Sequence, residues 1–357
     1  MRRFRSFVTC ALAVAGCGLV SAVAAAQTPA PPPDDTPSIS VGATIFSQYT
    51  YTSSPQKTDA DGNLYHPSSF DVTRSYININ GKVSHLVSFR ITPDIARVSN
   101  GDLELRLKYA FAQINFDQWM TKGSWARFGQ QQTPLIDYQE GVYRYRFQGT
   151  TFTEREGYLT SSDIGASFHG NFPNNYGDVH VGIYNGEGYH APEANNQPSF
   201  QIRGTLRPFA KGAPDAHGLR VTAFYDADNY VKDGEKKRAL FETSFEHKYV
   251  NAAFDYLDTH DQKSVTAINA HGHGYSFWIT PRTTVGLEGL IRYDHYIPNT
   301  SFDNQVHKRT IVGVAYWFPH KGNVSAAFLV DYDDAKYENI TTQPENKVFG
   351  VHALINF

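Results

Sequence analysis

The chain has 357 residues, and its 32 Lys and Arg against 35 Asp and Glu give a formal net charge of −3. This balance excludes the strongly basic surface of a nucleic-acid-binding protein, so no nucleic-acid partner is expected. Both cysteines, Cys10 and Cys17, lie near the start of the chain. Disulfides, thiolate chemistry and zinc–thiolate sites are therefore not expected beyond them, and no cofactor or metal is predicted.

The first 26 residues have the layout of a secretory signal peptide. Three arginines among the first five residues precede an apolar, alanine-rich run over residues 7–23, and Ala24 to Ala26 supply the small residues of a cleavage site. A transmembrane helix needs a bulkier run of about 20 residues. Cleavage after Ala26 is predicted, and it leaves a net charge of about −6 because three arginines and no acids are lost. Lipoprotein processing at Cys17 is the alternative.

Residues 27–38 contain five prolines and predict an extended periplasmic spacer. From residue 39 to residue 357 the dominant pattern is an alternation with period two, as in Thr283 to Asp294 and in Val324 to Tyr332. Mean hydropathy is only −0.43, yet aromatic residues make up 14% of the chain. Both values fit strands of which only alternate residues face lipid, with Tyr and Phe at the interfaces. The predicted fold is all-β: a transmembrane antiparallel β-barrel.

Segments with this alternation number about sixteen, an even number as single-chain outer-membrane barrels require. The predicted strands are 38–52, 69–82, 84–96, 102–118, 123–133, 161–171, 177–186, 197–208, 217–230, 236–248, 249–260, 263–280, 282–296, 305–318, 323–334 and 346–357. The connections expected on the periplasmic side are mostly tight. The long ones, 53–68, 134–160 and 335–345, fall on the expected extracellular side.

The C-terminus has apolar residues at every second position from Phe349 to Phe357. An alternating final strand that ends on Phe is typical of chains inserted by the barrel-assembly machinery, so this machinery is a predicted partner through Phe357. Outer-membrane lipids and lipopolysaccharide are the other expected partners, and the outer membrane of a Gram-negative cell is the predicted location. A soluble β-sandwich is the alternative fold, because its strands also alternate.

Three segments carry a family resemblance. They are FDVTRSYINING at 70–81, ARFGQQQTP at 126–134, and residues 154–188, which include DIGASFHG and GIYNGEG. In this order and spacing they resemble the phosphate-selective porin O and P family. The resemblance implies a sixteen-stranded, homotrimeric channel whose third extracellular loop, here 134–160, folds into the lumen. It also implies that Arg and Lys side chains line the pore.

The water-facing register and the 134–160 loop supply the candidate site. Guanidinium groups stay charged and offer planar donor forks to oxyanions, and rings of Arg or Lys favour anions in a narrow pore. Acidic residues in the same register, such as Glu242 and Glu288, could instead neutralise these cations in ion pairs. The predicted pore-lining and anion-binding residues are Arg74, Arg90, Arg106, Lys108, Arg127, Arg144, Arg146, Arg203 and Arg207.

The function predicted at this point is passive diffusion of small hydrophilic solutes through an outer-membrane porin, with a modest preference for phosphate-like anions. No enzymatic activity and no catalytic residues are predicted. The alternatives are a non-selective porin, an outer-membrane barrel enzyme and an adhesin. Three weaker patterns resemble a calcium loop, a metal pair and a catalytic trio: Asp59, Asp61 and Asn63; His271 and His273; and Asp163, Ser167 and His169.

Overall fold

A computed structural model describes residues 34–357 except 99–100, 194, 303, 321, 323 and 341–342. The predicted signal peptide, with Cys17, and most of the proline-rich spacer lie outside these residues, so both stay predictions. No helix in the described part is long and apolar enough to cross a membrane.

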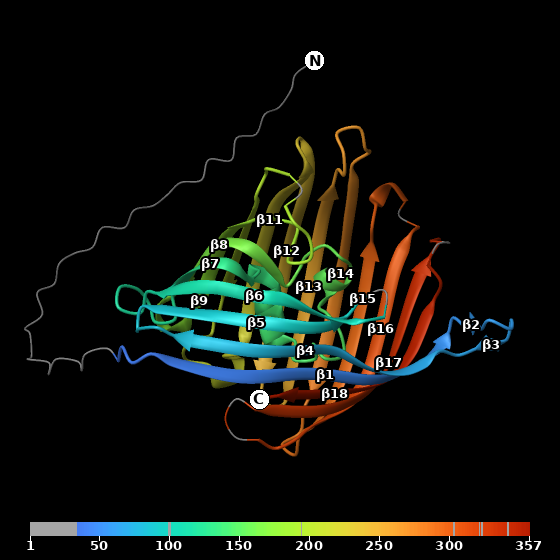
Figure 1. Cartoon of the computed structure of the whole chain (residues 1–357), viewed down its shortest axis with the longest axis horizontal. Coiled ribbons are helices and arrows are strands. Elements are labelled where there is room, and N and C mark those ends of the chain that lie inside the picture. The colour runs from blue at the N-terminus through green and yellow to red at the C-terminus, as the bar shows by residue number, and fades with distance from the viewer. Residues whose placement is uncertain are drawn as a thin grey trace, which may run out of the picture. The chain divides into compact units, whose positions relative to one another are not determined.

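Sixteen long strands of the described chain form one closed antiparallel barrel, which confirms the predicted fold class. Each strand pairs with its neighbours in chain order, and the last strand pairs with the first (Figure 1). The barrel strands are β1 (Ser38–Ser54), β4 (Ser68–Lys82), β5 (Val87–Arg97), β6 (Leu103–Asn115), β7 (Trp125–Gln132), β8 (Ser162–Asn171), β9 (Gly177–Tyr184), β10 (Ser199–Leu206), β11 (Leu219–Val231), β12 (Gly234–His247), β13 (Val250–Asp261), β14 (Ala270–Pro281), β15 (Leu287–Ile297), β16 (Val306–Trp317), β17 (Ser325–Glu338) and β18 (Asn346–Asn356).

The alternation in sequence becomes an alternation between the two faces of the wall. In β17, Phe328 and Val330 are 52% and 59% exposed on the outer face, whereas Leu329 and Asp331, which alternate with them, are buried. Val330 is paired with Val314 on β16 and with a valine on β18, so the exposed apolar residues form a continuous outer surface. The inner face carries the buried charged and polar residues of the barrel.

The connections follow the predicted asymmetry only in part. The turns at 83–86 and 248–249 are short and the connection at 133–161 is long, as expected. However, residues 207–218 form a long connection at the end of the barrel where tight turns predominate, and residues 232–233 form a two-residue turn at the opposite end.

Two predicted strands begin later than the alternation indicated. β14 starts at Ala270 rather than at residue 263, because the preceding residues form a turn in which the hydroxyl groups of Ser264 and Thr266 are bonded to each other. β15 starts at Leu287 rather than at residue 282. There the Thr283 hydroxyl accepts the Leu287 N–H at 3.0 Å, and Gly286 takes a φ of 89°, which favours glycine.

Shorter elements occupy the connections. They are β2 (Lys57–Thr58), β3 (Leu64–Tyr65), α1 (Pro134–Val142), α2 (Phe152–Arg155), and the 3₁₀ turns η1 (Pro173–Asn175), η2 (Pro214–Ala216) and η3 (Thr300–Phe302). Strands β2 and β3 pair with each other. In the turn between them, Asp59 accepts the backbone N–H groups of Asp61 and Asn63. The carboxylate considered for a calcium loop thus closes a turn.

Candidate functional site

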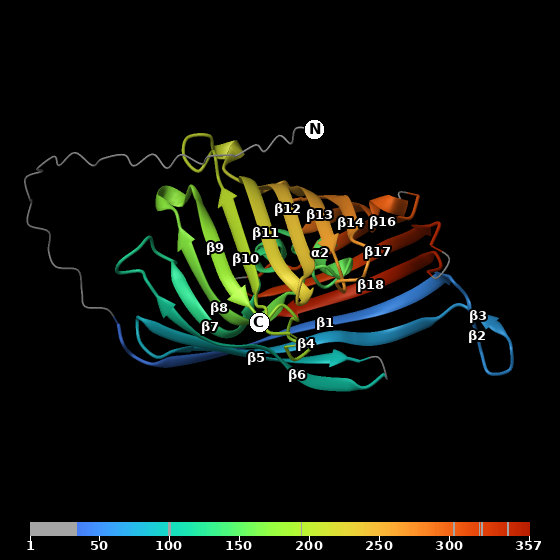
Figure 2. The same ribbon diagram turned by 90° about the horizontal axis from the view of Figure 1, so that it is seen from above.

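The segment between β7 and β8, residues 133–161, lies against the inner wall of the barrel (Figures 1 and 2). Gln139 of α1 donates its side-chain amide to Glu242 of β12 at 3.0 Å. On β15, Arg292 donates Nη1 to the carbonyl oxygen of Thr150 at 2.8 Å. Contacts with strands so far apart around a closed ring place the segment in the interior. It is called the inward segment below.

Glu288 of β15 anchors the middle of the inward segment. Arg144 donates Nη2 to both Glu288 carboxylate oxygens, at 2.6 and 2.9 Å, and the Tyr145 hydroxyl donates to Oε2 at 3.0 Å. The Arg144 guanidinium also stacks 4.5 Å from the ring centroid of Trp317. The charge of Arg144 is therefore already matched by a carboxylate of the wall.

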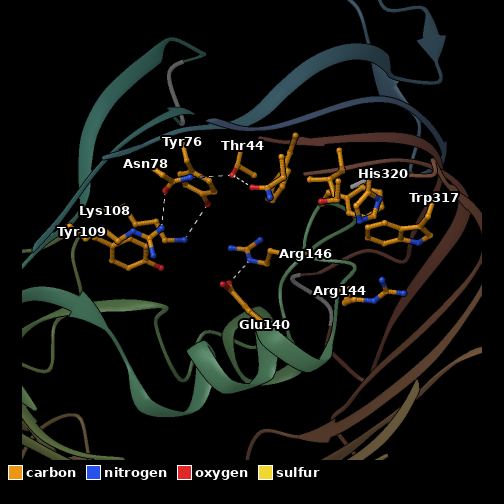
Figure 3. Close-up of a pocket in the computed structure, with 16 residues that line it drawn as sticks. Thr44, Tyr76, Asn78, Lys108, Tyr109, Glu140, Arg144, Arg146, Trp317 and His320 are labelled. Carbon is orange, nitrogen blue, oxygen red and sulfur yellow. Dashed lines mark hydrogen bonds and ion pairs between the residues drawn. The ribbon is translucent and has the colours of Figure 1, made fainter. Parts of the chain in front are cut away.

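A cavity of about 420 Å³ lies between the inward segment and the wall formed by β1, β4–β6 and β16–β18 (Figure 3). This volume is within the range of sites that hold small organic ligands. The cavity is lined by Thr44, Phe46, Tyr76, Asn78, Arg90, Lys108, Tyr109, Glu140, Arg144, Arg146, Phe147, Trp317, His320, Ser325, Leu354 and Asn356.

Two cations on the β5–β6 flank of this cavity have no carboxylate partner among the described residues. Arg90 donates Nε to the Thr92 hydroxyl at 3.0 Å and Nη2 to the Asn78 side-chain oxygen at 2.8 Å. Lys108, only 3% exposed, donates Nζ to the Tyr76 hydroxyl at 3.1 Å. All these partners are neutral, so both charges act on the cavity without a counter-charge in contact.

The inward segment places one carboxylate opposite these cations. Glu140 accepts Nε of Arg146 at 2.7 Å, and Figure 3 shows this pair between the two flanks of the cavity. Burial acts to raise the pKa of Glu140, but the nearby Lys108 and Arg146 outweigh it and hold the pKa of this carboxyl below its ordinary value. The cavity therefore contains an ionised Glu140 with an excess of positive charge around it.

A second cavity, of about 350 Å³, shares Arg90 with the first and is also lined by Arg127. Arg127 donates to the side-chain oxygens of Gln113, at 2.7 Å, and Gln132, at 3.0 Å. Its guanidinium lies 3.7 Å from the ring centroid of Trp125. No Asp or Glu of the described chain pairs with it. Arg127, Arg90 and Lys108 thus form a series of cations without carboxylate partners along two cavities.

Other predicted site residues lie apart from the cavities. Arg74 and Arg106 both donate to Oδ2 of the fully buried Asp94, at 3.0 and 2.8 Å. Arg203 is committed to structure: it donates to the carboxylate of Asp178 and to the carbonyl oxygen of Pro134 at the start of the inward segment.

Arg207 follows the last residue of β10 and lines neither cavity. Of the nine predicted residues, the structure therefore gathers five around the cavities: Arg90, Lys108, Arg127, Arg144 and Arg146.

Sequence reasoning missed the aromatic part of the lining. Phe46, Phe147 and Trp317 border the larger cavity and are each at most 8% exposed. A signal for Phe46 existed, because the strand alternation places it in the water-facing register together with Thr44. A large apolar side chain on the polar face of a barrel strand indicates a packing partner in the lumen, which here is Phe147, with ring centroids 6.5 Å apart.

The three residues that resemble a catalytic trio do not bond to one another. The Ser167 hydroxyl donates to Gln131 at 2.5 Å, and Asp163 accepts backbone N–H groups. His169 lies 3.3 Å from a carboxylate oxygen of Asp178. Each of the three side chains is bonded to a group outside the trio.

The two histidines that resemble a metal pair face aromatic neighbours on β13. The His271 ring centroid lies 4.0 Å from that of His260, and the His273 ring is stacked against Tyr256 with centroids 6.4 Å apart.

No protein-family model and no curated protein matches the chain. Several solved structures match the chain. An anion-selective porin from Comamonas acidovorans matches with a TM-score of 0.62 at 9% identity, over 90% of this chain and 100% of the other. The trimer form of OmpT of Vibrio cholerae matches with a TM-score of 0.61 at 14% identity, over 90% and 100%. OmpF of Salmonella typhi, in a complex with daunomycin, matches with 0.59 at 13%, over 89% and 97%.

These likenesses show a porin-like barrel fold. They do not confirm the phosphate-selective porin O and P family in particular. The prediction that the chain is not an enzyme is corrected by the same comparison. Structures of OmpT, an outer membrane protein, stand among the matches at 12–14% identity, and a likeness at this level shows the fold alone. The fold therefore does not set the chain apart from barrels with catalytic activity.

Proposed function

We propose that the chain is an outer-membrane porin through which small hydrophilic solutes diffuse passively, with a preference for phosphate-like oxyanions. One observation carries the preference: Arg90, Lys108 and Arg127 face two cavities of the barrel interior without a carboxylate partner in the described chain. Unmatched cations along a narrow, low-dielectric path raise the local concentration of anions.

The arrangement also suits release. Each of the three cations is held by neutral hydrogen-bond partners, and none closes around a deep pocket. Several weak sites in a row allow an anion to enter and to leave, whereas one strong site would stop conduction. Glu140 adds an opposite charge across the larger cavity, so the solute path has a transverse field.

The remaining parts of the proposal concern the setting of the barrel. The exposed apolar outer wall supports a place in the outer membrane of a Gram-negative cell, in contact with lipids and lipopolysaccharide. Residues 1–26 serve as the export signal, and Phe357 serves as the recognition end for the barrel-assembly machinery. A homotrimer is proposed because one OmpT match is described as a trimer form.

The test is the reversal potential of purified protein in planar bilayers across a gradient of potassium chloride. Chloride is expected to permeate better than potassium, and Lys108→Gln, Arg90→Gln and Arg127→Gln are each expected to reduce this preference. Lys308→Gln is the control, because Lys308 is paired with Glu338 at 2.7 Å, away from both cavities. A preference for potassium, or an absence of conductance steps, would refute the proposal.

A further inference from the structure

Four aromatic rings run side by side along the larger cavity. Tyr76 and Phe46 have ring centroids 6.0 Å apart, Phe46 and Phe147 6.5 Å, and Phe147 and Trp317 5.9 Å. They come from β4, β1, the inward segment and β16, and all four line the cavity. We call this row the aromatic arc. Such an apolar surface in the lumen does not contribute to selection by charge alone.

The two ends of the aromatic arc differ in charge. At one end the Lys108 ammonium lies 4.7 Å from the Tyr76 ring centroid, and at the other the Arg144 guanidinium lies 4.5 Å from that of Trp317. Arg144 is paired with Glu288, which also lies 3.6 Å from Nε of Arg282, whereas Lys108 donates only to a phenol. The Lys108 end of the arc therefore carries a positive charge with no carboxylate in contact.

A second free cation strengthens that end. Arg90 and Lys108 lie over the same ring, at 4.7 and 5.4 Å from the Tyr109 centroid, so their charges are close together. In Figure 3, Lys108 and Tyr109 stand on the opposite side of the cavity from Trp317, with Arg146 and Glu140 between them. The cations without a carboxylate in contact thus lie on one flank of the cavity, and the aromatic arc runs from Tyr76 on that flank to Trp317 on the other.

We propose that this cavity is a subsite for amphipathic organic anions, and specifically for aromatic monocarboxylates. The carboxylate is held by Lys108 and Arg90, and the flat apolar body lies along Phe46, Phe147 and Trp317. This inference rests on the porin function proposed above and names a class of organic anion that this cavity favours.

The rings distinguish such a solute from inorganic phosphate. Aromatic faces carry a partial negative charge, so they contribute no favourable binding energy to a small, fully hydrated oxyanion. Transfer of an apolar body from water to this surface is favourable, and an aromatic body is stabilised further by stacked or edge-to-face contacts. Phosphate binds at the cations only, whereas an aromatic carboxylate binds at both flanks.

The experiment compares the block of single-channel current by benzoate, cyclohexanecarboxylate, acetate and inorganic phosphate at equal ionic strength. Benzoate is expected to block at about tenfold lower concentration than acetate, the ratio that one favourable aromatic contact gives. Trp317→Leu and, independently, Phe147→Leu are expected to raise the benzoate concentration for half-block by about tenfold and to leave acetate and phosphate unchanged. Lys108→Gln is expected to weaken the block by all three carboxylates.

The matched control is Phe328→Leu, because Phe328 is an aromatic residue on the outer face, 52% exposed. Trp317→Phe is expected to retain the benzoate block, which separates loss of the ring from loss of packing. Channels that prefer chloride but are blocked equally by acetate and benzoate would overturn the inference and leave the porin function standing. A phosphate block stronger than that of benzoate and insensitive to Trp317→Leu would also overturn it. Protein without channel currents would refute the porin function itself.

Discussion

At the scale of single residues, the charge of the barrel interior depends on which cations are paired with a carboxylate. Asp94 is the carboxylate partner of two of them. It is fully buried on β5, and Arg74 and Arg106 both donate to its Oδ2 atom while Oδ1 has no hydrogen-bond partner. One carboxylate thus faces two guanidinium groups, and the cluster keeps an excess of one positive charge inside the barrel.

Asp94→Asn is expected to increase the anion preference, because the substitution removes a negative charge from the interior. It is also expected to lower the free energy of unfolding by about 2 kcal/mol, less than the 3–5 kcal/mol of a fully buried pair, because both arginines retain partial contact with water. The measurements are the reversal potential and urea unfolding in lipid vesicles. The control is Asp71→Asn, whose partner Arg97 is 41% exposed; an equal effect in both variants would contradict the role given to Asp94.

The alternation in sequence placed Arg90, Lys108 and Arg127 on the water-facing side of their strands, but it could not tell them from Arg106. The difference depends on register between strands. In the ladder of β5 and β6, Asp94 stands directly opposite Arg106, and that pairing follows from a shift of the register at Pro93. Period two in one strand contains no information on its neighbour's register, so the ion pairs could not be predicted.

At the scale of elements, the inward segment is fixed by side chains rather than by strand pairing. Its interior contacts are hydrogen bonds and ion pairs to the wall, above all those of Arg144 and Tyr145 to Glu288. If one of these anchors is lost, the charged partner stays buried in the lumen without a counter-charge. Loss of an anchor therefore destabilises the position of the segment.

Glu288→Gln is expected to loosen the inward segment, since it leaves Arg144 without its carboxylate. The expected results are faster hydrogen exchange over residues 134–160 and larger current fluctuations in the open channel, with the barrel strands unchanged. Glu338→Gln serves as the control, because Glu338 is 47% exposed and pairs with Lys308 outside the lumen. Unchanged exchange in the Glu288 variant would show that packing, and not this anchor, holds the segment.

The sequence predicted the position of this segment, and the resemblance implied its inward course, but its two helices were not predicted. Signals for the first were present. Pro134 occupies the first turn of α1 and Asp137 follows in the same turn, both common at helix N-termini. The short α2 has no comparable pattern. The aromatic arc was also beyond prediction, because its rings come from four elements and meet only when the barrel closes.

At the scale of the whole molecule, the alternation was sufficient to predict sixteen strands and a closed antiparallel barrel. It succeeded because alternate residues of the strands form an apolar outer face, and few residues interrupt the period. It failed at residues 263–269 and 282–286, where β-branched and polar residues continue the alternation into turns that hydroxyl groups close.

The outer wall gives a direct test of membrane insertion with two valines that are equally exposed, at 59% each. Val330 lies within β17 among apolar neighbours, and Val265 lies in the connection before β14. Val330→Arg is expected to make folding into bilayers less favourable by about 2–4 kcal/mol, and Val265→Arg by about 0–1 kcal/mol, because the cost of a charge depends on depth. Equal costs, measured by reversible denaturation in vesicles, would place Val330 outside the hydrocarbon region.

The pairing of β1 with β18 has a consequence for how the chain is made. Phe357 donates its N–H to the carbonyl oxygen of Ala43 at 2.9 Å and accepts the N–H of Ala43 at 3.0 Å. The ring is therefore closed by the pairing of β1 with β18, and a chain that lacks β18 leaves two rows of unpaired backbone groups. Such edges attract other strands and are not tolerated in lipid. Closure of the barrel therefore requires β18, and a chain in which β1 and β18 have not yet paired exposes both edges.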